Sequence, residues 1–305
     1  MRKVIILGAA GTLGSTTAFC LAQQQLTEEI VLADVNENVL KNHLMDLKCA
    51  FPKQSFQLAN LNEHIGDADL VILAASVPNR NNVKSRNDFL TENLDVVKNL
   101  SPWLQRCAKN SLIITATNPV DIINYYLYTE LCFDRRQLIG YTLNDSARFE
   151  RSIRNILSIP ADASGFAPVM GEHGETQVPV FSQVQFEGER VVFSQEQKWE
   201  IVTDINQYFS QFNALNVNRT TGWTSGIGIA QLVSKLSQSE SSLVMGSSIL
   251  QGEYGIEHQS IAVPLLVSRR GVERVVEWKL DDEEQKAFFE SSQTVAHYVS
   301  VAGLN

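Results

Sequence analysis

A glycine-rich turn directly after an apolar run restricts the fold of this chain more than any other feature of the sequence. The run Lys3–Leu7 is typical of a buried strand, and the turn after it opens a helical pattern that includes Ala18 and Leu21. Small residues let the backbone turn tightly and let a pyrophosphate approach the amide groups at the helix N-terminus. We therefore expect a dinucleotide to bind at this turn, through Gly8, Gly11, Thr12, Leu13 and Gly14.

An acidic residue after the next predicted strand strengthens this interpretation. Asp34 follows the apolar run Ile30–Ala33 and lies twenty residues after Gly14. A carboxylate at this position accepts hydrogen bonds from the adenosine ribose and repels a 2′-phosphate, which favours NAD over NADP. An aspartate can also cap a helix or form a turn, and this alternative stays open.

Two other classes of nucleotide-binding enzyme are disfavoured by motifs that the sequence lacks. Short-chain dehydrogenases and sugar epimerases share the glycine spacing but need a Tyr-x-x-x-Lys pair, and none of the seven tyrosines has a lysine four residues later. A P-loop nucleotide hydrolase needs a Gly-x-x-x-x-Gly-Lys motif that ends in Ser or Thr, and the chain has none.

The predicted elements indicate an α/β chain with two parts. Further apolar runs at Leu70–Ala75 and Leu112–Thr115 alternate with amphipathic helical stretches. Continuous apolar runs suit strands that are covered on both faces, which predicts a Rossmann-type doubly wound parallel sheet. We expect this NAD-binding domain to comprise residues 1–143.

The pattern changes after about residue 145. A hairpin is predicted around Phe186–Val192 with its turn at Glu187-Gly188, and long helices are predicted around Gln195–Phe212 and Asp281–Val301. These mixed elements predict an α+β substrate-binding and catalytic domain of residues 144–305. The serine-rich stretch Ser237–Ser242 is interpreted as a surface loop or helix terminus.

Composition and charge exclude several partners. The chain of 305 residues has 25 basic and 34 acidic side chains, a net charge of −9, and no long basic stretch for a nucleic acid or an anionic membrane. The opening apolar stretch is too short for a signal-peptide core, and no later stretch is long enough to cross a membrane, so we expect a cytoplasmic protein. The spacing of the four cysteines and five histidines predicts neither disulfides nor a metal site.

Several short motifs in the rest of the chain carry groups suited to proton transfer and carboxylate binding. One histidine, His173, stands between Gly171 and Gly174, where its ring can face a cleft. A single histidine is more often structural, but acidic, amide and basic partners occur elsewhere, in Thr117–Asp121, in Asp145–Arg148 and in the loop Pro78–Arg86.

Taken in order, these motifs resemble the L-lactate/malate dehydrogenase family. The resemblance runs almost from end to end, because Thr221–Trp223, Gly252–Gly255 and Gly271–Glu273 also follow the family's order. It implies an NAD-dependent dehydrogenase that interconverts an L-2-hydroxy acid and its 2-oxo acid, in a homodimer or homotetramer.

The resemblance also implies roles for four charged residues. His173 is expected to exchange a proton with the substrate oxygen, and Asp145 to orient the imidazole and stabilise the imidazolium. Arg148 is expected to bind the substrate carboxylate with two parallel donors, and Arg86 to polarise the reacting carbonyl. Alternatively, Asp145 caps a helix and the arginines are solvated surface charges.

Three more positions match the pocket by resemblance. Asn118 is expected to contact the substrate or the nicotinamide, Thr221 to form part of the substrate pocket, and Asn93 to line the pocket near the cofactor. Two of them have an alternative: Asn118 precedes Pro119 and favours a turn by itself, and Asn93 suits an ordinary helix face.

The substrate itself is indicated by Arg80, which lies six residues before Arg86. In malate dehydrogenases an arginine at this separation selects the substrate, and it would pair with the second carboxylate of oxaloacetate. Malate is therefore the favoured substrate. The loop departs from the family pattern, however, since Asn79 is interposed and Asn81–Lys84 replaces Lys-Pro-Gly, so L-lactate or a branched L-2-hydroxy acid stays an alternative, as does a catalytically impaired NAD-binding homologue.

Two further departures lie beside the motifs of the catalytic residues. Asn144 stands where the family usually has leucine, and Glu175 where aspartate is common. The sequence offers no physical reason for either.

Overall fold

A computed structural model describes residues 1–61, 66–78, 89–215 and 222–304 of the chain. Its main feature is one sheet with the strand order β14-β13-β12-β6-β5-β4-β1-β2-β3. The parallel strands are β1 (Lys3–Leu7), β2 (Glu29–Ala33), β3 (Ser55–Ala59), β4 (Leu70–Leu73), β5 (Leu112–Thr115) and β6 (Leu138–Gly140). The antiparallel strands are β12 (Ser242–Gln251), β13 (Glu257–Ser268) and β14 (Gly271–Val275).

The parallel half of the sheet has the order of a dinucleotide-binding fold. The chain moves outward from β1 through β2 to β3 and then crosses to β4, β5 and β6 on the other side. Strand order therefore reverses between β1 and β4, and ligands of such sheets bind beyond the carboxyl ends of the strands at this point. The apolar runs of β4 and β5 are buried along their whole length, which confirms the prediction of a sheet covered on both faces.

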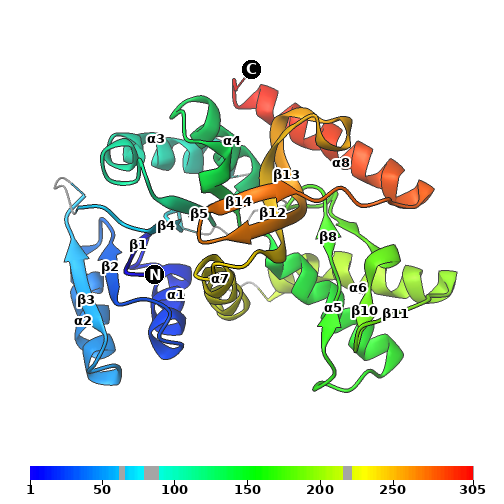
Figure 1. The fold of residues 1–305 in the computed structure, drawn as a ribbon, viewed down its shortest axis with the longest axis horizontal. Coiled ribbons are helices and arrows are strands. Elements are labelled where there is room, and N and C mark those ends of the chain that lie inside the picture. Colours follow the sequence, from blue (N-terminus) through cyan, green and yellow to red (C-terminus); the bar gives the residue numbers. More distant parts are fainter. Residues whose placement is uncertain (62–65, 79–88, 216–221, 305) are drawn as a thin grey trace.

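The helices of this half are α1 (Thr12–Gln23), α2 (Glu37–Ala50), α3 (Leu90–Cys107) and α4 (Val120–Thr129), with a short 3-10 helix η2 (Arg135–Gln137) before β6. Figure 1 shows α1 and α2 with β1–β3 at one end of the molecule and α5, α6 and two small sheets at the other. Helix α7 packs against α1, so the second half of the chain covers part of the first.

The second half contains helices α5 (Leu143–Leu157), α6 (Gln195–Ala214), α7 (Trp223–Leu236) and α8 (Asp282–Val301), and the 3-10 helices η3 (Phe181–Gln183) and η4 (Glu253–Gly255). Its short strands are β7 (Gly165–Phe166), β8 (Val169–Met170), β9 (Val178–Pro179), β10 (Gln185–Phe186) and β11 (Glu189–Arg190). The hairpin prediction is confirmed: β10 pairs with β11, and both Glu187 and Gly188 have positive φ. The two long helices are also confirmed, with Asp281 as the N-cap of α8.

The long antiparallel strands β12 to β14 were not predicted as part of the first sheet. Strand β12 pairs with β6 at Ser247 and Gly140, which makes the sheet continuous across the proposed boundary at residues 143/144. A single large apolar core includes β1, β4 and β5 as well as β12 and β13, and a smaller core around Phe149 lies beneath α5 and α6. The sheet and the large core therefore extend across the proposed domain boundary. The division into an NAD-binding and a substrate-binding domain stays a proposal from the sequence about which part binds which ligand.

Among the described residues 1–61, 66–78, 89–215 and 222–304, no helix is long and apolar enough to cross a membrane. The same residues contain no group of three or more His, Cys, Asp or Glu side chains that could hold a metal ion.

Candidate active site

The turn between β1 and α1 is shaped by two glycines that tolerate no side chain. Gly8 has a φ of +87°, and a Cβ there would lie 2.5 Å from the backbone nitrogen of Ala75. A Cβ on Gly14 would lie 2.3 Å from the carbonyl oxygen of Gly8. Gly11, the N-cap of α1, has no such close contact, since the nearest atom to a Cβ would be 3.3 Å away. The turn therefore brings the N-terminus of α1, where an anion such as a pyrophosphate can bind, close to β1 and to the segment after β4.

The carboxylate of Asp34 lies against this turn. Its Oδ2 accepts the backbone N–H of Ala10 and its Oδ1 accepts that of Asn36, each at 3.0 Å. Asn36, and not Asp34, is the N-cap of α2, so the helix-cap alternative is wrong. The bond from Asn36 is a local turn contact, and the bond of Asp34 to a ribose stays a prediction. The half-buried carboxylate joins the glycine-rich turn to the end of β2, the position from which an acidic group meets an adenosine ribose.

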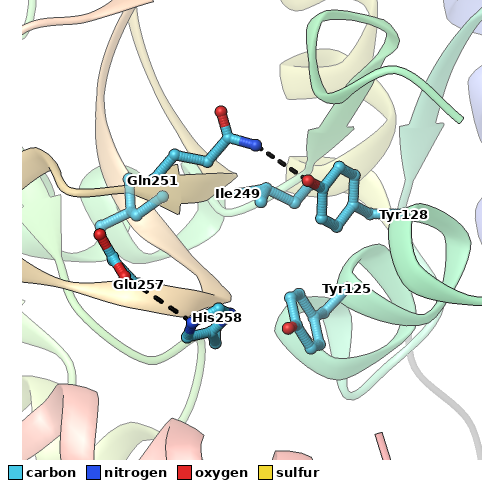
Figure 2. Close-up of a pocket in the computed structure, with 7 residues that line it drawn as sticks. Tyr125, Tyr128, Ile249, Gln251, Glu257 and His258 are labelled. Carbon is cyan, nitrogen blue, oxygen red and sulfur yellow. Dashed lines mark hydrogen bonds and ion pairs between the residues drawn. The ribbon is translucent and has the colours of Figure 1, made fainter. Parts of the chain in front are cut away.

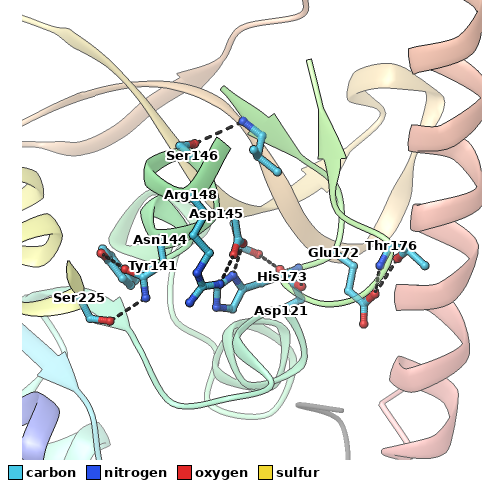
Figure 3. Close-up of polar contacts among 12 residues, drawn as sticks. Asp121, Tyr141, Asn144, Asp145, Ser146, Arg148, Glu172, His173, Thr176 and Ser225 are labelled. Carbon is cyan, nitrogen blue, oxygen red and sulfur yellow. Dashed lines mark hydrogen bonds and ion pairs between the residues drawn. The ribbon is translucent and has the colours of Figure 1, made fainter. Parts of the chain in front are cut away.

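A buried histidine and aspartate form the centre of the second group. His173 follows β8 and Asp145 lies in the first turn of α5, and both are more than 90% buried. The Nδ1 atom of His173 is 2.5 Å from Oδ2 of Asp145 (Figure 3). The N-cap of α5 is Thr142, so the interpretation of Asp145 as the cap is wrong. An ionised carboxylate only accepts hydrogen bonds, which assigns the hydrogen to Nδ1 and leaves Nε2 without a hydrogen in the neutral ring.

The backbone of His173 is held separately, by Asp121 at the start of α4. Oδ2 of Asp121 accepts the backbone N–H of His173 at 2.8 Å, and Oδ1 accepts the hydroxyl of Ser247 at 2.5 Å. The Ser247 hydroxyl also lies 2.8 Å from that of Ser260, to which Asn124 donates at 3.0 Å. Burial raises the pKa of Asp121 to about 7, although both hydrogen bonds to its carboxylate act in the opposite direction. The position of His173 thus depends on α4, β12 and β13 together.

Arg148 lies one turn after Asp145 on α5 and is held from two sides. Its Nη1 atom is 3.3 Å from Oδ1 of Asp145, the oxygen that does not face His173. The centre of its guanidinium lies 4.5 Å from the ring centroid of Tyr208 on α6. Because both side chains contact the Asp145 carboxylate, the cation lies beside the imidazole (Figure 3).

Known proteins match this chain over nearly its whole length. The NAD-binding domain of lactate/malate dehydrogenases matches residues 2–140, and their α/β C-terminal domain matches residues 142–300. The chain belongs to the lactate/malate dehydrogenase family. It is accordingly an NAD-dependent 2-hydroxy acid dehydrogenase. The tight backbone turn at Gly8 and Gly14, which leaves no room for a side chain, and the carboxylate of Asp34 beside it fit the NAD cofactor.

A malate dehydrogenase and an L-lactate dehydrogenase have the same sequence identity to this dehydrogenase. It is 30% identical to a malate dehydrogenase of Halobacterium salinarum, over 99% of this chain and 100% of the relative. It is also 30% identical to L-lactate dehydrogenase 1 of Staphylococcus aureus, over 99% of this chain and 97% of the relative. Among solved structures, a malate dehydrogenase of Cryptosporidium parvum superposes with a TM-score of 0.90, at 26% identity and 99% coverage of both chains.

The two asparagines predicted near the cofactor lie together in the dehydrogenase. Asn93 is 2% exposed; its Oδ1 accepts the backbone N–H of Val77 at 2.8 Å and its Nδ2 donates to the carbonyl of Asn118 at 2.7 Å. Asn93 thus joins the segments that follow β4 and β5, and its contact with the cofactor stays a prediction. The buried Oδ1 of Asn118 has no partner among the described residues, as expected of an atom reserved for a ligand.

Three predicted residues, Arg80, Arg86 and Thr221, lie outside the described residues, and their roles stay predictions. Nothing in the described contacts explains Glu175. Two neighbours of His173 and Arg148 were not predicted in their observed roles, namely Asp121 as the group that holds the His173 backbone and Tyr208 as the ring beneath Arg148. Asp121 is the last residue of the motif Thr117–Asp121, and its place in that motif could have indicated a functional role. Tyr208 occurs in an ordinary amphipathic helix, and nothing in the sequence marks it.

Tyr208 offers a direct test of how the arginine is held. Replacing Tyr208 by leucine is expected to raise the KM for the oxo acid about three- to tenfold, because a cation over a ring contributes about 0.5–2 kcal/mol. Tyr208→Phe keeps the ring and is expected to keep the wild-type KM in steady-state assays. Equal KM values for the leucine and phenylalanine variants would show that the ring does not position Arg148.

A cavity of about 210 Å³ lies at the carboxyl end of α4, the end opposite to Asp121 (Figure 2). In it, Gln251 donates to the hydroxyl of Tyr128 at 2.8 Å. It contains none of the residues predicted to bind cofactor or substrate and is therefore separate from the active site; its lining consists of Tyr125, Tyr128, Ile249, Leu250, Gln251, Glu257 and His258.

Proposed function

We propose that this dehydrogenase interconverts L-malate and oxaloacetate, with His173 as the acid and base. The observation that carries the proposed chemistry is the contact of the two Asp145 oxygens with His173 and Arg148. One carboxylate thereby positions both a proton-exchanging ring and a carboxylate-binding cation, a combination that reduction of a 2-oxo acid needs. Arg80 in the sequence supports the dicarboxylic substrate.

The proton travels through His173. When bound, NADH supplies a hydride to the carbonyl carbon of the oxo acid. In that direction the protonated imidazole donates its Nε2 hydrogen to the carbonyl oxygen, and in the reverse direction neutral Nε2 takes a proton from the hydroxyl. Asp145 fixes the tautomer through Nδ1 and stabilises the imidazolium by its negative charge.

The arginines orient the acid. Arg148 binds the 1-carboxylate through two parallel donors, for which a planar guanidinium is suited. Arg86 polarises the reacting carbonyl and stabilises the charge that develops on its oxygen. Asn118 and Thr221 line the pocket, and Asn118 contacts the substrate or the nicotinamide through its unpartnered Oδ1.

The proposal is tested by comparing kcat/KM for oxaloacetate, pyruvate and a branched 2-oxo acid in parallel, with NADH oxidation as the signal. A preference for oxaloacetate supports malate dehydrogenase. The second candidate, an L-lactate or branched-acid dehydrogenase, is supported by the equal similarity to the Staphylococcus aureus L-lactate dehydrogenase and predicts a preference for a monocarboxylic acid. An impaired NAD-binding homologue would bind NADH and reduce none of the three; the intact contacts among His173, Asp145 and Arg148 argue against it.

Arg80 is expected to carry the choice between these acids. Arg80→Gln should lower kcat/KM for oxaloacetate at least about tenfold more than for pyruvate, because it removes the partner of the second carboxylate. Wild-type and variant are compared with both acids at saturating NADH. An equal loss on both would remove Arg80 from substrate selection.

We also propose a homodimer or homotetramer in the cytoplasm. The assembly is supported by exposed apolar side chains on the adjacent helices α1 and α7, namely Phe19, Trp223 and Ile227. The compartment is supported by the four cysteines, all of them free thiols in the structure.

A further inference from the structure

The start of α7 lies directly against the cofactor-binding turn. A Cβ on Gly222, the N-cap of α7, would be 3.4 Å from the Cα of Leu13 and from the carbonyl oxygen of Thr12. One turn later, a Cβ on Gly226 would be 2.6 Å from the Thr16 side chain. The backbone of α7 therefore approaches the beginning of α1 closely. Because of this close contact, a displacement of α7 would also displace the turn before α1.

The opposite side of the same turn of α7 is hydrogen-bonded to α5, the helix of Asp145 and Arg148. Nδ2 of Asn144 donates to the hydroxyl of Ser225 at 2.6 Å (Figure 3). The hydroxyl of Tyr141 donates to Oδ1 of Asn144 at 2.9 Å and lies 3.4 Å from the carbonyl oxygen of Thr224. Both ends of the Asn144 amide are thus used in one bridge between the two helices.

The surrounding packing is matched to this bridge. Tyr141 is 3% exposed, and a Cβ on Gly228 would lie 2.1 Å from its hydroxyl oxygen, so only glycine leaves room for the ring. Burial raises the pKa of Tyr141, which keeps the phenol protonated and able to donate. Leucine, the residue usual in the family at position 144, has no polar atom for either contact.

We propose that Asn144 is a positioning residue that, with Tyr141 and Ser225, sets the distance between the cofactor-binding turn and the catalytic group on α5. The inference rests on the proposed roles of His173, Asp145 and Arg148, and it gives a physical reason for a departure from the family pattern. Asn144 immediately precedes Asp145, so a displacement at Asn144 is transmitted to the carboxylate that orients His173. Hydride and proton transfer both depend on such distances, and errors of about 1 Å lower rates about a hundredfold.

The test uses the whole 305-residue chain and three substitutions. Asn144→Leu removes both contacts of the amide at nearly constant volume and is expected to lower kcat about tenfold, the effect of losing one or two neutral hydrogen bonds. Ser225→Ala removes only the hydroxyl that accepts from Asn144 and is expected to lower kcat about three- to tenfold. It keeps the test decisive if Asn144→Leu fails to fold. Ser225→Thr keeps the hydroxyl and is expected to stay within about twofold of wild type.

Three readouts separate positioning from a structural role. The Kd for NADH, measured by fluorescence, is expected to change less than about twofold in each variant, because the turn itself is intact. The double variant that combines Asn144→Leu with Ser225→Ala is expected to be no slower than Asn144→Leu alone, since the two changes remove the same bond. Thermal unfolding is expected to remain well above the assay temperature.

Wild-type kcat in Asn144→Leu with every oxo acid would overturn the proposal. So would multiplicative losses in the double variant, or a loss of NADH affinity with kcat unchanged. These outcomes are independent of the choice between malate and lactate, because each variant is compared with wild type on the acid that wild type prefers. A wild-type protein with no turnover would instead reject the proposed function.

Discussion

Replacing His173 by asparagine is expected to lower kcat at least about a thousandfold while the Kd for NADH changes less than about twofold. A positioned general acid contributes about 10²–10⁴ in rate, and the asparagine amide has no proton to exchange near neutral pH. Binding of NADH is expected to be retained, because the described residues expected at its pyrophosphate and ribose, from Gly8 to Asp34, lie on other elements. Steady-state oxidation of NADH gives kcat, and fluorescence titration with NADH gives the Kd.

A matched control for this substitution is His297→Asn on α8, which alters an exposed histidine and should leave both quantities at wild-type values. If His173→Asn turned over at the wild-type rate, the proton would have to come from another group and His173 would have no part in the mechanism. A large loss of NADH affinity would point to a change of fold in place of a chemical defect.

The second large effect is expected at Arg148. Lysine at this position keeps the charge but loses the planar pair of donors, so Arg148→Lys should raise the KM for the oxo acid about 30- to 100-fold, or about 2–3 kcal/mol of binding. The flat contact with the Tyr208 ring is lost as well. The measurement is a saturation curve in oxo acid at saturating NADH.

Arg151→Lys provides the control for Arg148. Arg151 lies near the same ring, at 5.7 Å, but pairs with Asp204 on the surface at 2.7 Å, and its substitution should leave KM unchanged. A wild-type KM in Arg148→Lys would mean that the substrate carboxylate is bound elsewhere.

The parallel half of the fold could be predicted from sequence because its signals are local. Continuous apolar runs such as those of β4 and β5 directly report burial on both faces, and the glycines after β1 report a turn without room for side chains. The union of β12 with β6 could not be predicted in this way, because strand pairing between segments more than a hundred residues apart leaves no periodic signal in either.

The site shows the same limit. Resemblance brought His173, Asp145 and Arg148 together in advance, and the described structure has them in contact. The contacts that support them come from residues whose neighbours are set only by tertiary packing: Asp121 under the His173 backbone, Tyr208 under Arg148, and Ser225 beside Asn144. Asn144 was visible as a departure from the family, but its reason required the position of α7.

The shared sheet limits how this molecule can open. Ser247 belongs to the strand that pairs with β6 and also donates to Asp121, which holds the backbone of His173. A hinge rotation of one half of the chain away from the other would separate β12 from β6 and would at the same time displace His173. Access for substrate and escape of product must therefore come from small local rearrangements around a rigid frame, and not from the halves of the chain swinging apart.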